Sequence, residues 1–81
     1  MSFVLYGRAW CHLCDDMRAE LEPIAQRFGV AIEWIDIDED PALEARYNEL
    51  VPVLTLDGVE LCHYKLDTAA VHATLLQTRG L

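Results

Sequence analysis

Two cysteines, Cys11 and Cys14, lie near the start of the chain within the segment RAWCHLCDD, residues 8–16. A pair spaced in this way can alternate between a dithiol and an internal disulfide. It can also supply half of a zinc site, or be two ordinary buried thiols. The redox chemistry needs an exposed thiolate that attacks a disulfide and a second thiol that completes the exchange. The strand or helix that holds each cysteine determines its exposure and its electrostatic surroundings, and these decide between the redox, zinc and structural alternatives.

A strand and a helix are predicted on either side of the first cysteine. Residues 3–6 (FVLY) form a short apolar run typical of a buried strand. An apolar stripe at helical spacing follows, and Gly29 is a plausible helix end. The chain lacks an N–H at Pro23, so we expect the helix to kink or break between residues 19 and 23. The stripe comprises Leu13, Met17, Leu21, Ile24, Ala25 and Phe28.

This arrangement places Cys11 at or just before a helix N-terminus, with Cys14 one turn on and on the same side. The helix dipole and outward N–H groups stabilise a thiolate there, which would lower the pKa of Cys11 below about 8.5. A protonated His12 would lower it further, although a solvated side chain is the alternative. Asp15 and Asp16 would repel the thiolate, so the direction of the net shift does not follow from the sequence.

The rest of the chain supplies three more strands and two helices. Residues 31–37 alternate as a second strand, and Asp40-Pro41 is a helix start. Residues 53–56 and 59–64 flank Asp57-Gly58, a strong hairpin signal. Asp67 caps a last helix that reaches Gly80 and whose core face comprises Ala70, Val71, Thr74 and Leu75.

The order β-α-β-α-β-β-α predicts an α/β fold with a four-stranded mixed sheet and helices on both faces. The periodicity places four side chains in the core, and leaves Trp34 either in the core or in an exposed patch. The predicted core residues are Phe3, Leu5, Ile32 and Leu54.

Composition narrows the classes of function. The 81 residues form a single expected domain, 1–81, with a net charge of −8. The sequence has no cluster of basic residues that would indicate nucleic-acid binding, and it has no apolar run long enough to span a membrane. No secretory signal is visible and the cysteine count of three is odd, so we expect a cytoplasmic monomer.

The segment CHLC after a strand, the dipeptide Val51-Pro52 and the element order resemble the thioredoxin fold in its smallest, glutaredoxin-like form. The resemblance covers nearly the whole chain and is strongest to a divergent bacterial glutaredoxin-like family of unassigned substrate. It implies a thiol–disulfide oxidoreductase in which Cys11 is the nucleophile and Cys14 the resolving thiol. It also implies a cis bond before Pro52, with the proline against Cys11 and the N–H and C=O of Val51 facing the substrate.

The resemblance implies a further substrate-binding residue and bears on the cosubstrate. Arg8 matches a position where glutaredoxins often carry Lys or Arg, which can stabilise the thiolate and contact a glutathione carboxylate. Glutaredoxins usually have Pro-Tyr between the cysteines and Gly-Gly before the last helix, whereas this chain has His12-Leu13 and large residues at 63–64. These departures argue against glutathione, which stays open only as a cosubstrate; no prosthetic group is required. The expected substrate is a disulfide-containing protein or a small thiol.

Two other classes of function stay open. The first is a binding module that keeps the cysteines without significant turnover. The second is a zinc protein in which Cys62 and His63 join the pair, although neighbouring strand residues point to opposite faces and we expect no metal. A two-residue hairpin places Cys62 opposite Val53, as a small apolar core residue.

Overall fold

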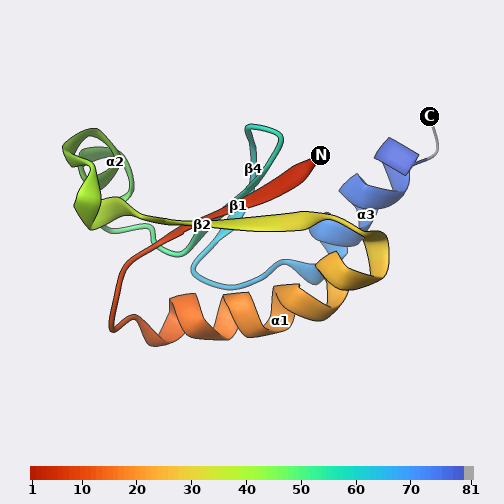
Figure 1. The fold of residues 1–81 in the computed structure, drawn as a ribbon, viewed down its shortest axis with the longest axis horizontal. Coiled ribbons are helices and arrows are strands. Elements are labelled where there is room, and N and C mark those ends of the chain that lie inside the picture. The colour runs from red at the N-terminus through yellow and green to blue at the C-terminus, as the bar shows by residue number, and fades with distance from the viewer. Residues whose placement is uncertain (80–81) are drawn as a thin grey trace.

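The computed structural model describes residues 1–79 (Figure 1); the predicted position of Gly80 in the last helix lies outside them. Along the chain, the elements follow the predicted order, with one added 3-10 turn, η1. They are β1 (Ser2–Gly7), α1 (His12–Phe28), β2 (Ala31–Asp36), η1 (Ile37–Glu39), α2 (Pro41–Tyr47), β3 (Val53–Leu56), β4 (Val59–His63) and α3 (Thr68–Arg79).

The four strands form one mixed sheet in the order β2-β1-β3-β4. β1 pairs with β2 in parallel, as the intervening helix α1 requires, and β3 is antiparallel to both β1 and β4. The apolar strand β1 therefore lies inside the sheet, and its residues Phe3 and Leu5 are fully buried. The cysteine segment leaves the sheet directly after this strand.

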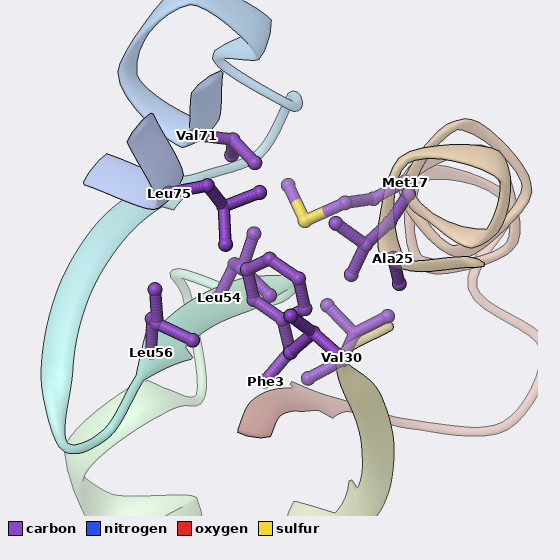
Figure 2. Close-up of a cluster of buried hydrophobic side chains, with 10 residues drawn as sticks. Phe3, Met17, Ala25, Val30, Leu54, Leu56, Val71 and Leu75 are labelled. Atoms are coloured by element: carbon purple, nitrogen blue, oxygen red, sulfur yellow. The ribbon is translucent and has the colours of Figure 1, made fainter. Parts of the chain in front are cut away.

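Helices cover both faces of the sheet, as predicted. On one face, side chains of β1 and β3 pack against Met17 and Ala25 of α1 and Val71 and Leu75 of α3 (Figure 2). On the other face, Tyr47 of α2 joins Val53 and Ile37 in a smaller cluster. Burial of these apolar side chains is the main force that holds the helices to the sheet.

Of the two expected effects of Pro23, the break does not occur, because α1 continues as a helix from His12 to Phe28; the kink stays a prediction. The side chain of Pro23 is exposed, while Leu21 and Ala25 on either side of it are buried. Packing of these neighbours on the sheet outweighs the hydrogen bond that the proline removes. The helix ends as predicted at Gly29, which has a φ of 67°.

The apolar stripe of α1 agrees with the prediction from Met17 to Phe28 and differs at its first residue. Leu13 is 42% exposed, and Cys14 takes its place as the first fully buried residue of the helix. On the edge strand β2, Ile32 and Trp34 are partly buried and pack against the larger cluster. An edge strand offers only partial cover to its side chains, so Ile32 is less buried than the predicted core residues of β1 and β3.

The hairpin between β3 and β4 turns at Asp57 and Gly58, both of which have the predicted positive φ. The predicted register is wrong beyond the turn. Cys62 lies opposite Leu54 instead of Val53, because the pairing shifts by one residue between Leu54 and Thr55. This irregularity leaves Leu61 as the extra residue of a β-bulge, and Leu61 and Cys62 both contact the core.

None of the helices within residues 1–79 is long and apolar enough to span a membrane.

Candidate functional site

Cys11 and Cys14 form a disulfide at the N-terminus of α1, with their Cα atoms 5.2 Å apart. Cys11 is the N-cap residue, in extended conformation, and its Sγ accepts a hydrogen bond of 3.1 Å from the backbone N–H of Cys14. The sulfur thus occupies the position in which Ser, Thr or Asp usually caps a helix. A negative charge on this sulfur would meet the positive end of the helix dipole.

The two cysteines differ in exposure. Cys11 is partly exposed, whereas Cys14 is fully buried. A β-carbon built on Gly7 would lie 3.0 Å from Sγ of Cys14 and 2.8 Å from Cζ3 of Trp34, so the sulfur and the indole ring are neighbours across this glycine. A substrate can therefore approach Cys11, while the protein covers Cys14.

Three ionisable residues surround the pair on the first turns of α1. His12, between the cysteines, has an exposed side chain. Asp15 and Asp16 are exposed as well, and Asp15 lies in the first turn. The carboxylates and the helix dipole act on a Cys11 thiolate in opposite directions.

The peptide bond between Val51 and Pro52 is cis. Pro52 is buried and its carbonyl accepts a hydrogen bond of 2.9 Å from the N–H of Tyr64. The N–H of Val51 donates to the carbonyl of Tyr47 at 3.2 Å. This N–H therefore has a partner within the chain, in the turn after α2, and its role in facing a substrate stays a prediction.

Arg8 does not contact the cysteine pair through the interactions of its guanidinium. Nη2 donates to Oδ1 of Asn48 at 2.8 Å and lies 3.3 Å from Oδ1 of Asp38. Nε is buried and has no partner among the described residues. Arg8 thus ties the loop before the cysteines to η1 and to the end of α2, and Asp38 offsets its charge.

Cys62 is the one cysteine outside the disulfide, and it is partly buried on β4. Burial raises the pKa of the Cys62 thiol; a hydrogen bond from the backbone of Asp67 opposes this, and the charges of Asp67 and Glu60 raise it further. The neighbouring His63 is exposed, and its Nδ1 lies 3.7 Å from Oε2 of Glu60. No group of three or more His, Cys, Asp or Glu residues within the described part of the chain is placed to hold a metal ion.

A groove of about 280 Å³ runs beside the cysteine motif, between α1 and the loop that joins β4 to α3. This groove was not predicted from the sequence. One of its sides carries the cysteine motif, but the other side, residues 64–66, lies far along the chain and has no recognisable motif. The only signal was the replacement of two small residues before the last helix by larger ones. The groove is lined by Leu13, Asp16, Met17, Glu20, Tyr64, Lys65 and Leu66.

Comparisons with known proteins agree with this geometry. The model of a family described as "Glutaredoxin-like domain (DUF836)" matches residues 2–76. The solution structure of protein Ne2328 from Nitrosomonas europaea is 40% identical, with a TM-score of 0.80 over 90% of this chain and 88% of that one. Thioredoxin 1 from Thermosipho africanus, at 23% identity, has a TM-score of 0.68 over 98% and 99% of the two chains, which shows the fold alone. The uncharacterized protein Rv0508 of Mycobacterium tuberculosis is 27% identical over 79 residues, 91% of this chain and 81% of that protein.

Proposed function

Because the chain belongs to the glutaredoxin-like domain family (DUF836) and has the thioredoxin fold, we propose that it is a thiol–disulfide oxidoreductase. The observation that carries the proposal is the asymmetric disulfide at a helix N-terminus. Cys11 caps the helix and is partly exposed, whereas Cys14 is fully buried. A nucleophile and a resolving thiol need this difference in access.

The reaction starts from the reduced protein. The Cys11 thiolate attacks one sulfur of a substrate disulfide, forms a mixed disulfide and releases the other substrate sulfur as a thiolate. Cys14 gives its proton to the substrate thiolate released in the first step and attacks Sγ of Cys11, which releases the second substrate thiolate. The protein ends with the Cys11–Cys14 disulfide and the substrate has gained two electrons; an external dithiol or two monothiols return the protein to its reduced form.

The neighbouring residues take supporting roles in this proposal. The carbonyl of Val51, beside Pro52, is the backbone group offered to the substrate, since the Val51 N–H is bonded to Tyr47. Arg8 holds the loop before Cys11 against α2 instead of binding a glutathione carboxylate. His12 is proposed to tune the Cys11 thiolate from the first turn. The reaction needs no prosthetic group and suits a reducing compartment such as the cytoplasm.

The test is the pH dependence of alkylation of Cys11 in the reduced Cys62→Ser protein. We expect Cys11 to react with iodoacetamide as a thiol with a pKa clearly below about 8.5, because the helix N-terminus favours its charged form. The matched control is Cys11→Ser in the same background, in which the buried Cys14 should react far more slowly.

A second variant traps the intermediate. Cys14→Ser should accumulate a mixed disulfide between Cys11 and a small aromatic disulfide, because no resolving thiol is present, and Cys11→Ser should accumulate none. Disulfide reduction no faster than that of a free dithiol such as dithiothreitol, with Cys11 titrating at or above about 8.5, would contradict the proposal. It would favour a binding module instead.

A further inference from the structure

Two exposed aromatic residues with left-handed backbone lie near the cysteine motif, one directly before Cys11 and one on the wall of the groove beside the motif. Among the described residues, three that are not glycine have positive φ, and Asp57 is explained by the hairpin turn. The other two are Trp10, with a φ of 61°, and Tyr64, with a φ of 67°. Bulky side chains rarely adopt this conformation, and where they do the surrounding structure must hold them there. Trp10 directly precedes Cys11 and is fully exposed.

Tyr64 is held by contacts on both sides of the cis-proline. Its N–H donates to the carbonyl of Pro52 at 2.9 Å, and its hydroxyl donates to the carbonyl of Glu49 at 2.8 Å. The ring of His63 packs edge-on against it, with the centroids 4.7 Å apart. Tyr64 as a whole is still 45% exposed, so these contacts fix an aromatic wall that faces the groove without filling it.

The opposite wall of the groove belongs to α1 and carries the cysteine motif. Leu13, which lies between the two cysteines, is 42% exposed and lines the groove together with Met17. The volume of about 280 Å³ lies at the lower limit of the roughly 300–1,000 Å³ of most small-molecule sites. It suits one apolar side chain of an extended segment lying beside the disulfide.

The charge of the groove is acidic. Asp16 and Glu20 line it against a single cation, Lys65, and neither carboxylate forms an ion pair with a described residue. The net charge of the whole chain, which includes these residues, is −8. Such a field attracts cationic segments and slows the approach of anions. Glutathione, with two carboxylates and one ammonium group, is an anion at neutral pH.

We propose that this groove docks a polypeptide segment of a protein disulfide substrate, with an apolar side chain next to the reacting cysteine and a Lys or Arg nearby. The inference rests on the proposed function and names its substrate class. Leu13, Met17 and Tyr64 receive the apolar side chain, and Asp16 and Glu20 receive the cation.

The experiment compares two peptide disulfides that share a Leu beside the cysteine and differ only in carrying Lys or Glu two residues away. We expect the second-order rate constant for reaction of the reduced protein to be about tenfold or more higher for the Lys peptide at low salt, within the range of electrostatic steering. The preference should shrink as ionic strength rises, because salt screens exposed charges.

Matched variants separate the groove from the overall charge. The double variant Asp16→Asn, Glu20→Gln should lose most of the preference for the Lys peptide. The control Glu33→Gln, Glu44→Gln changes the net charge by the same amount at exposed positions outside the groove and should keep it. Leu13→Ser should slow both peptides by a similar factor. In all of these variants, circular dichroism checks that the fold is intact. Because Asp16→Asn also removes a charge near Cys11, the ratio of the two peptide rates is compared within each variant instead of the absolute rates.

The outcomes distinguish this inference from the proposed function. Efficient reduction of both peptides at equal rates, or faster reduction of glutathione disulfide than of the Lys peptide, would overturn the docking site and leave the oxidoreductase in place. Equal losses of preference in the two double variants would overturn it as well. Absence of exchange with every disulfide would overturn both proposals.

Discussion

Gly7 is the residue that allows the sheet to approach the disulfide. It ends β1, and a side chain there would meet the ring of Trp34 and, at 3.0 Å, Sγ of Cys14. The close approach of strand, indole ring and sulfur therefore depends on the missing β-carbon.

We predict that Gly7→Ala lowers the free energy of unfolding by about 1–3 kcal/mol, because the added methyl overpacks the contact with Trp34. Trp34→Ala alone also destabilises the protein. Combined with Gly7→Ala it should cost less than the sum of the two changes, because the methyl then has room. Urea denaturation of the three variants measures this coupling; strict additivity would contradict the proposed contact.

A second prediction at this scale concerns Cys62, the free thiol of the oxidised protein. Burial raises its pKa, so the folded protein should react with iodoacetamide more slowly than the urea-unfolded protein at the same pH. The unfolded thiol ionises first as the pH rises, so the unfolded state binds fewer protons and stability falls above about pH 8.5. Cys62→Ala should weaken that fall, whereas a reactivity equal to that of the unfolded protein would contradict the prediction.

At the scale of elements, two helices begin at aspartates that the sequence analysis predicted as N-caps. Oδ1 of Asp40 accepts from the N–H of Ala42 at 2.9 Å, and Oδ1 of Asp67 accepts from the N–H of Ala70 at 3.0 Å. The second cap matters more for the core, because α3 contributes the fully buried Val71 and Leu75. It also places a carboxylate near Cys62.

We predict that Asp67→Ala lowers the free energy of unfolding by about 0.5–2 kcal/mol, the usual value of an N-cap hydrogen bond. Asp67→Asn should retain most of the stability, because its side-chain oxygen can accept the same bond. Thermal unfolding followed by circular dichroism checks both variants. An Asn variant as unstable as the Ala variant would show that the charge, and not the cap, is what stabilises α3.

At the scale of the whole molecule, one cluster joins both long helices to the sheet (Figure 2). Leu54 lies within it on β3, is fully buried, and pairs with Leu5 of β1 and Cys62 of β4. The cluster thus connects the helix that carries the cysteines to the strand that follows the cis-proline. Its loss would disturb the fold and the site together.

We predict that Leu54→Ala lowers the free energy of unfolding by about 2–5 kcal/mol, as large cavities in a core do. This is a large part of the 5–15 kcal/mol typical of a small domain. The control Val59→Ala, at a position that is 63% exposed, should change stability by less than about 0.5 kcal/mol. Similar losses in the two variants would contradict the assignment of Leu54 to the core.

Local sequence patterns were enough to predict the order of the elements, the hairpin turn, the capped helix starts and the cysteine pair at a helix N-terminus. These features depend on residues within one or two turns of each other, so periodicity and turn chemistry specify them. The predicted break in α1 failed because tertiary packing outweighed the local preference of proline. Pro23 does not break α1, because the buried neighbours Leu21 and Ala25 hold the helix on the sheet.

Tertiary structure alone decided which groups surround the disulfide. Arg8 binds Asn48, forty positions further along, and Tyr64 reaches Glu49 across fifteen. The bulge in β4 moved the partner of Cys62, and the groove formed between segments that no sequence window contains. Contacts of this kind form between segments that are far apart in the sequence and that meet only when the core packs. Local sequence patterns therefore cannot predict them.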